Sequence, residues 1–128
     1  MTPRERFMDA LLDAKYILVR MLGDTTTVRE HKNYIEDESA IEVNETFYMF
    51  WDAECDEWNI HIARSIPATR TEPEDCDYIN VGGVHQKASR AIEELLKVIL
   101  QVRIDNIVGD YYTHKEWEEH ERIEREGM

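Results

Sequence analysis

The residues of this chain that could do chemistry are carboxylates standing beside large aromatic side chains. Residues 24–63 hold eleven Asp and Glu but only two Lys and Arg, and they also hold the densest aromatic run. Carboxylates can orient a basic partner, and aromatic rings anchor interfaces because they bury a large area at low entropic cost. This pattern favours recognition of a positively charged protein surface. The predicted contact residues are Tyr48, Phe50, Asp52, Glu54, Asp56, Glu57 and His61.

A simpler explanation of these residues stays open at this point. The acidic side chains could serve only to keep the protein soluble. A terminal helix or a second copy of the chain could cover Tyr48 and Phe50. A homo-oligomer formed through this face would satisfy both interpretations in part.

A second group of residues surrounds two adjacent glycines between a predicted strand and a predicted helix. Backbone N–H groups at a helix N-terminus attract phosphate or carboxylate groups, and nearby cations would add to that attraction. The pattern matches neither GxxxxGK[ST] nor GxGxxG, so a tight turn is the simpler explanation. The residues of this alternative site for a small, nucleotide-like anion are Arg64, Arg70, Gly82, Gly83, His85, Lys87 and Arg90.

Signatures of metal binding and catalysis are weak. The alternating carboxylates of residues 52–56 imitate the start of a calcium loop but lack its glycine and its distal glutamate. We predict no metal and no cofactor. Acidic neighbours should raise the pKa of the Cys55 and Cys76 thiols and make them poor nucleophiles. An enzyme that uses His61 or His85 as a base has no motif behind it, so we expect no enzymatic activity.

The composition excludes some classes of function. A formal net charge of −13 over 128 residues argues against direct binding of nucleic acids or anionic membranes, which depends on Lys and Arg. The length is that of one domain. The two cysteines form no CxxC pair, and no signal peptide or membrane-spanning apolar run is visible. We therefore expect a cytoplasmic protein; whether the two cysteines pair stays open.

Capping boxes of the form Thr-x-x-Glu define the first predicted helices. The box at Thr2–Glu5, together with Gly23, predicts a helix over 3–22. A second box at Thr27–Glu30 predicts a short helix that ends near residue 37.

Strands are predicted where the apolar period changes to two. They cover residues 40–44, 46–51 and 58–63, with a fourth at 78–81. If the second and third form a hairpin, one face carries the pairs Trp51 with Trp58, Met49 with Ile60, and Phe47 with Ile62. The opposite face then presents Tyr48, Phe50, Asn59 and His61.

The rest of the chain predicts a long loop and two helices. Residues 64–77 are predicted as a loop, 84–108 as a long helix that ends at Gly109, and a third capping box at Thr113–Glu116 starts a charged terminal helix. The predicted fold is α+β: an antiparallel sheet of three to four strands packed by the N-terminal and long helices. The predicted organisation is one domain over 1–109 and a helical appendage over 110–128.

These observations favour a non-enzymatic acidic protein that masks a basic, nucleic-acid-binding surface of a partner protein. Immunity proteins, antitoxins and phage inhibitors of host defence have this character. The alternative is a protein that binds or sequesters a small anion at the glycine pair.

Overall fold

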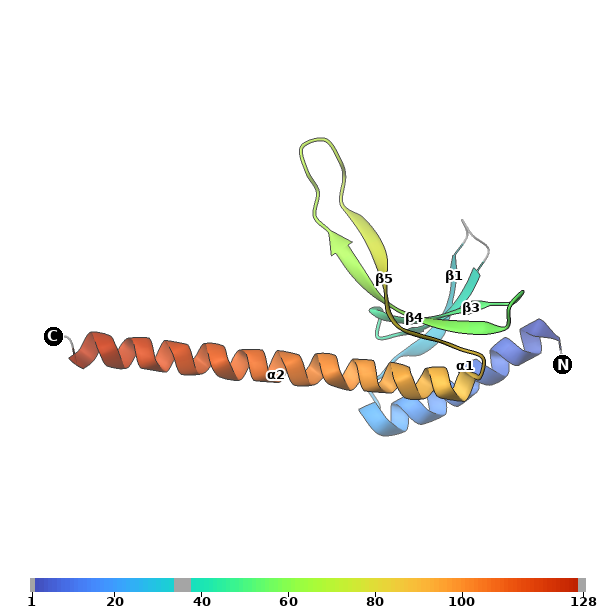
Figure 1. The fold of residues 1–128 in the computed structure, drawn as a ribbon, viewed down its shortest axis with the longest axis horizontal. Coiled ribbons are helices and arrows are strands. Elements are labelled where there is room, and N and C mark those ends of the chain that lie inside the picture. The colour runs from blue at the N-terminus through green and yellow to red at the C-terminus, as the bar shows by residue number, and fades with distance from the viewer. Residues whose placement is uncertain (1, 34–37, 127–128) are drawn as a thin grey trace. The chain divides into compact units, whose positions relative to one another are not determined.

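The computed structural model describes residues 2–33 and 38–126, and the chain divides into two compact units, Met1–Val98 and Ile99–Met128. The elements are α1 (Pro3–Leu22), β1 (Val28–Asn33), β2 (Glu38–Val43), β3 (Phe47–Asp52), β4 (Glu57–Ile66), β5 (Asp75–His85) and α2 (Ala88–Glu126). The strands form one antiparallel sheet in the order β1-β2-β3-β4-β5 (Figure 1). The α+β class is confirmed, with five strands where three or four were predicted.

Helix α1 begins and ends where its capping chemistry places it. The Thr2 hydroxyl accepts a hydrogen bond from the Glu5 N–H at 3.1 Å and donates to a Glu5 carboxylate oxygen at 3.0 Å. Pro3 occupies the first helical position, where its missing N–H costs nothing. Gly23 ends the helix with φ 107°, a value that side chains disfavour. The predicted helix over 3–22 is confirmed.

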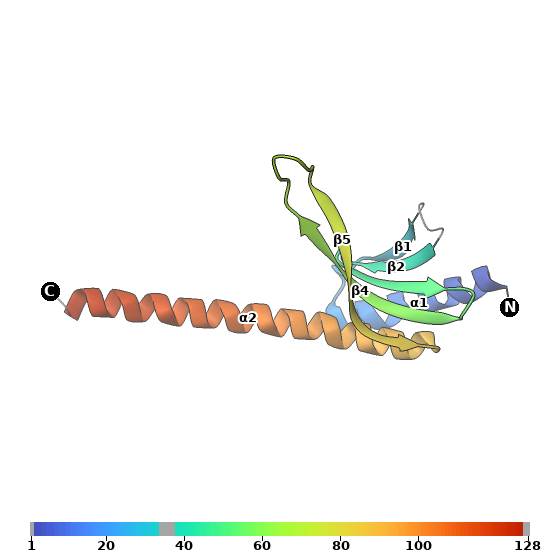
Figure 2. The same ribbon diagram turned by 45° about the horizontal axis from the view of Figure 1, so that its top comes forward.

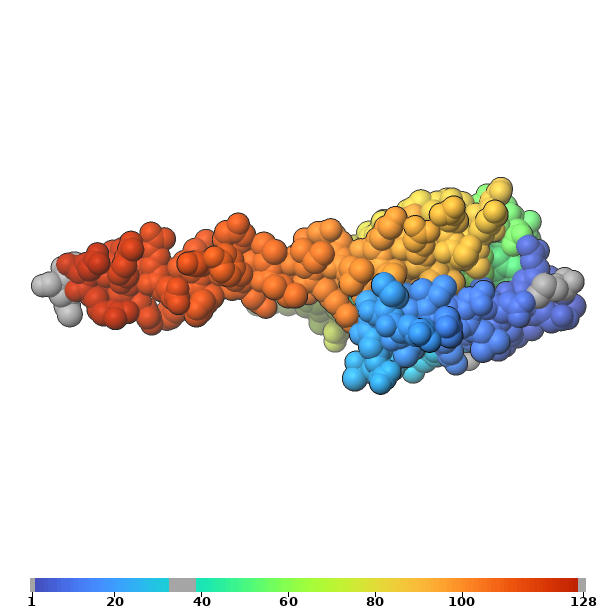
Figure 3. Space-filling view, turned by 90° about the horizontal axis from the view of Figure 1, so that it is seen from below, coloured from blue at the N-terminus to red at the C-terminus, as the bar shows by residue number. Residues whose placement is uncertain are grey.

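One face of the sheet packs against α1 and the first turns of α2, which lie side by side in the first unit (Figure 3). Apolar side chains from alternate strand positions point to this face. The ring centroids of Trp51 and Trp58 are 5.7 Å apart, and the Phe7 ring of α1 lies 6.1 and 6.0 Å from them. The fully buried side chains of this core include Leu18, Ile41, Met49, Ile60, Ile92 and Leu95.

The predicted hairpin register is confirmed. Strand β3 pairs with β4 so that Trp51 lies opposite Trp58, and the pairs Met49 with Ile60 and Phe47 with Ile62 follow. A shift of one residue would have moved every one of these side chains to the other face.

The opposite face of the sheet, here called the outer face, carries a smaller aromatic cluster. Tyr48 and Phe50 are buried there, with relative exposures of 5% and 7%, and Ala63 and Tyr78 pack against them. The Tyr78 ring meets the rings of Tyr48 and Phe50 edge-on at 5.1 and 5.3 Å. Because Ala40 and Ala63 are small, the three rings have room to cover one another. The expectation that Tyr48 and Phe50 form an exposed face is therefore wrong.

The segment after α1 is a strand, not the predicted short helix. The Asn44 N–H donates to the Thr27 carbonyl, the Thr27 N–H donates to Asn44 Oδ1, and β1 then pairs with β2 along its whole length. The Thr27–Glu30 capping box does not start a helix here. Successive side chains of a strand point to opposite faces, and the polar side chains of this segment find partners on both faces of the sheet. The part of the predicted helix at residues 34–37 lies outside the described residues.

The predicted loop over 64–77 is shorter than expected: residues 67–74 connect the strands, while 64–66 belong to β4 and 75–77 to β5. Strands β4 and β5 have 10 and 11 residues, against six in each of the others. The hairpin that they form therefore extends beyond the rest of the sheet (Figure 2). Pro67 and Pro73 lie between the strands and set their limits, because proline cannot donate to a ladder.

Helix α2 starts later and ends later than predicted. Strand β5 continues through both glycines to His85, and the helix starts at Ala88. The helix also runs through Gly109, so the predicted separate terminal helix is the last part of α2. The Thr113 hydroxyl does not cap a helix there; it donates to the Gly109 carbonyl at 2.9 Å, four residues back.

Candidate functional site

A row of polar side chains crosses the outer face, one from each strand. The strand registers align Arg29 with Glu42, Glu42 with Tyr48, Tyr48 with His61, and His61 with Asn80. Cross-strand neighbours at one level have their Cβ atoms about 5 Å apart, which is within hydrogen-bonding reach for long side chains. The row therefore brings one polar side chain from each strand to the same level of the sheet.

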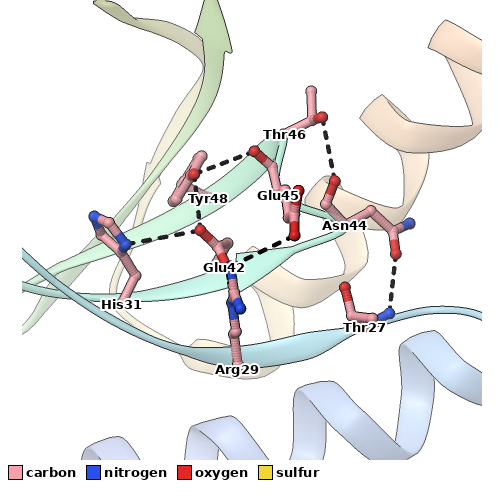
Figure 4. Close-up of polar contacts among 8 residues, drawn as sticks. All are labelled: Thr27, Arg29, His31, Glu42, Asn44, Glu45, Thr46 and Tyr48. Atoms are coloured by element: carbon pink, nitrogen blue, oxygen red, sulfur yellow. Dashed lines mark hydrogen bonds and ion pairs between the residues drawn. The ribbon is translucent and has the colours of Figure 1, made fainter. Parts of the chain in front are cut away.

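Glu42 is the centre of this row (Figure 4). It is a buried carboxylate, with a relative exposure of 5%. One oxygen accepts a hydrogen bond from Arg29 Nε, and the other accepts from the Tyr48 hydroxyl at 2.9 Å. His31 Nδ1 lies 3.7 Å from the second oxygen, so a protonated His31 would form an ion pair with Glu42. The three neighbours satisfy the buried charge from two strands.

The surroundings of Glu42 and Tyr48 fix their protonation. Burial alone would raise the pKa of Glu42, but the hydrogen bonds from Arg29 and Tyr48 outweigh it and hold that pKa below its ordinary value. Burial, together with the adjacent Glu42 carboxylate, raises the pKa of Tyr48. At neutral pH, Glu42 is therefore ionised and Tyr48 protonated. Together with Arg29 and His31 they form a group that links β1, β2 and β3 electrostatically, here called the clamp.

His61 lies further along the row. Its ring meets the Phe50 ring edge-on at 4.9 Å, and burial lowers its pKa. Within the described residues its Nδ1 atom is buried without a hydrogen-bond partner. A neutral imidazole is the form that this apolar contact favours.

The acidic turn, residues 52–57, is held in place by its own carboxylates. One Asp52 oxygen accepts from the backbone N–H groups of Glu54 at 3.0 Å and Cys55 at 3.3 Å. Asp56, with φ 52°, accepts from the Trp51 indole N–H at 3.3 Å and forms an ion pair with Arg6 of α1. The turn is thus tied both to the core and to α1, and Glu54 projects from it exposed.

The glycine pair is part of β5, and its surroundings are already occupied by an anion. The Gly83 N–H donates to Glu94 Oε1 at 2.6 Å, and the other Glu94 oxygen contacts His85 Nε2. Burial alone would raise the pKa of Glu94, but the Gly83 N–H and His85 outweigh it and lower that pKa. The anion that these groups hold in this structure is the chain's own carboxylate from α2.

The cations of the predicted anion site are not brought together. Arg64 forms an ion pair with Asp77 at 3.3 Å, and Arg90 pairs with Glu93 at 3.1 Å. Arg64 is five residues along β4 from the partner of Val84, or about 16 Å at the usual strand rise. Arg70 lies further out, in the connection between β4 and β5. Only Lys87 stands close in sequence to the glycines.

We expect Gly82→Ala to lower the free energy of unfolding by about 0.5–1.5 kcal/mol, the usual contribution of one intramolecular hydrogen bond, because the Gly83–Glu94 bond that it breaks is exposed. A Cβ atom at Gly82 would lie 2.1 Å from Glu94 Oε1 and 3.1 Å from the Ile60 Cβ, so the Glu94 carboxylate must leave the Gly83 N–H. Urea unfolding measures the loss. Gly109→Ala is the control, because nothing lies within 4 Å of its added Cβ.

The same substitution in a Glu94→Ala background should cost much less than in the wild-type chain, because the displaced carboxylate is already gone. If the losses in stability from the two substitutions are fully additive, Glu94 is not the group that requires residue 82 to lack a side chain.

The two cysteines are free and exposed. Cys55 lies in the acidic turn, whereas Cys76 lies opposite Ser65 near the far end of the β4–β5 hairpin. The predicted effect of acidic neighbours is confirmed for Cys55, whose pKa is raised chiefly by Asp52.

Glu42 was expected from the sequence as part of the acidic-aromatic surface of residues 24–63, whereas Arg29, His31 and Glu94 were not predicted. The signal for a strand at residues 28–33 would have been an alternation of apolar and polar residues, but only Val28 among them is apolar. Glu94 had no local signal, because its contact with Gly83 depends on the packing of α2 against β5.

Comparison with known proteins gives no relative: no family model, no curated protein and no solved structure matches the chain. Across residues 2–33 and 38–126, no cluster of His, Cys, Asp and Glu has the geometry of a metal site. Neither helix has, in its described part, an apolar stretch long enough to cross a bilayer.

Proposed function

We propose that this chain is a non-enzymatic, cytoplasmic binding protein that masks a basic surface of a partner protein. Immunity proteins, antitoxins and phage inhibitors of host defence act in this manner. The observation that carries the proposal is the acidic turn of residues 52–57, whose backbone is held by its own carboxylates and by the core.

A fixed acidic turn suits recognition of a cationic surface. A loop that is ordered before binding loses less conformational entropy when it binds. Asp56 of this turn is engaged by Arg6, while Glu54 is exposed and has no ion pair among the described residues. The net charge of −13 adds long-range attraction to a basic partner and speeds encounter.

The aromatic residues take a supporting part in this proposal. Tyr48 and Phe50 are buried, so they stiffen the outer face next to the turn instead of contacting the partner. His61 is partly buried beside Phe50. The contact residues are accordingly Asp52, Glu54, Asp56 and Glu57, of which Glu54 and Glu57 can be changed without cutting the bonds that hold the turn.

We expect Glu54→Lys/Glu57→Lys to weaken binding to a basic partner about tenfold or more, because two attractions become repulsions. The measurement is affinity capture from a lysate at low and high salt, followed by titration of the captured basic protein against purified variants. Glu72→Lys/Glu74→Lys is the matched control, since it makes the same change in charge at two exposed residues between β4 and β5.

A partner that the wild type and the control retain at low salt, and that the turn variant loses, supports masking through the turn. Equal binding by both charge variants would contradict it.

A further inference from the structure

The second unit exposes a regular apolar stripe. Leu100, Ile104, Ile107 and Tyr111 of α2 have relative exposures of 37%, 52%, 68% and 55%. Their spacing is four, three and four residues, which is the spacing of the core positions of a coiled coil. Residues at this spacing lie on one side of a helix. We call these four residues the α2 stripe.

Short-range interactions within α2 do not account for this stripe. The helix of the second unit is supported by pairs one turn apart, such as Gln101 with Asp105 at 2.8 Å and His114 with Glu118 at 3.0 Å. Each such pair contributes only about 0.2–0.5 kcal/mol. Helices gain most of their stability by burying an apolar face, and four large apolar residues in water are a cost that another helix could remove.

We propose that the α2 stripe binds the same stripe of a second copy of this chain, with the two helices antiparallel. The spacing of four, three and four reads the same in both directions. An antiparallel pair therefore places Leu100 opposite Tyr111 of the second copy and Ile104 opposite its Ile107. One two-fold axis then relates the two copies, and each of the four apolar layers contains one residue from each copy, as a self-complementary interface requires.

The flanking charges select this orientation. Arg103 lies between Leu100 and Ile104, and Asp110 lies between Ile107 and Tyr111. In the antiparallel pair these two positions flank the same two layers, so Arg103 of each copy meets Asp110 of the other. Opposite charges at such flanking positions set the orientation of paired helices.

A parallel pair is disfavoured by the residues that continue the spacing. After Tyr111 the same side of the helix carries His114, Glu118 and Glu121. Parallel helices would place each glutamate against its own copy in the seam, where like charges repel. Residues 110–128 carry seven acids against three Lys and Arg, and antiparallel helices keep these acidic ends apart.

The size of the stripe sets the strength of the association. A stable interface buries about 800 Å² on each partner, and four layers of one helix supply less than that. We therefore expect a reversible dimer with a dissociation constant on the order of 1–100 µM. The α2 stripe shares no residue with the acidic turn, so the dimer proposal stands whether or not the turn binds a basic protein.

The test is sedimentation equilibrium of the full chain across about 1–500 µM, the range that brackets such a constant. The mass should rise from 15.2 kDa towards twice that value as concentration increases. Ile107→Glu should remain a monomer throughout, while Ile123→Glu, the same change at an exposed residue off the stripe, should dimerise like the wild type. A wild-type monomer at all concentrations, or a dimer that Ile107→Glu leaves intact, would overturn the proposal.

Orientation is tested by reversing the flanking charges. Arg103→Asp alone should weaken the dimer about tenfold, and Arg103→Asp/Asp110→Arg should restore it, because each new pair is again opposite in sign. In a parallel pair Asp110 would instead lie near Lys115 of the other copy, and the double variant would not recover. A double variant that stays as weak as the single one would overturn the antiparallel arrangement.

Discussion

Truncation of Phe7 to alanine is expected to lower the free energy of unfolding by about 3–5 kcal/mol, the range for a large aromatic residue removed from a core. The Phe7 side chain is 1% exposed and stacks against both Trp51 and Trp58. It is the residue through which α1 closes over the β3–β4 hairpin. Denaturant unfolding followed by tryptophan fluorescence measures the loss directly.

Leu12→Ala on the same helix is the matched control. Leu12 is 59% exposed, so its truncation should change stability by no more than about 0.5 kcal/mol. Comparable losses for Phe7 and Leu12 would mean that α1 does not pack on the sheet through the face described.

The second large effect is expected at Glu42. Glu42→Gln should lower the free energy of unfolding at neutral pH by about 1.5–3 kcal/mol, the usual range for hydrogen bonds to a charged group. The substitution removes the charge that accepts from Arg29 and Tyr48. Glu45→Gln is the control, because Glu45 is exposed and its oxygen lies 3.8 Å from Arg29.

The same pair of variants gives a pH dependence with a defined sign. The pKa of Glu42 is lower in the folded chain than its ordinary value of 4.5. Its stabilising contribution is therefore complete above about pH 5 and is lost as the pH falls through the folded pKa. The wild type should lose more stability than Glu42→Gln on acidification, while Glu45→Gln should follow the wild type.

Part of the wild-type loss should remain in Glu42→Gln. Glu30 and Glu94 also have lowered pKa values, through Arg4 for Glu30 and through Gly83 and His85 for Glu94. Parallel pH profiles for wild type and Glu42→Gln would show that the clamp does not depend on an ionised Glu42.

The elements with a strong local signal were predictable from sequence. The Thr2 cap and Gly23 defined α1. Alternation between residues 46 and 63 gave the β3–β4 register, because the two tryptophans share a face only in that register. In both places capping, propensity and pattern point to the same structure.

The remaining features depended on tertiary contacts. The Thr27–Glu30 box has the letters of a helix start, yet pairing with β2 determined the structure. The burial of Phe50 depends on Tyr78, which approaches only because β4 and β5 are long. The anion near Gly83 is supplied by Glu94, eleven residues later, and no local pattern records that packing.

The order β1-β2-β3-β4-β5 has a consequence for how the chain folds. Each strand pairs only with strands adjacent in the sequence, so the whole sheet can form from successive hairpins of low contact order. Chains of this kind close their loops at little entropic cost and tend to fold quickly.

Covering the sheet is a different matter, since Phe7 and Ile92 come from opposite ends of the first unit. During synthesis α1 can cover its part of the apolar face at once, but the part that α2 covers stays in water until the start of α2 has left the ribosome. That interval is when a molecular chaperone would have most to bind.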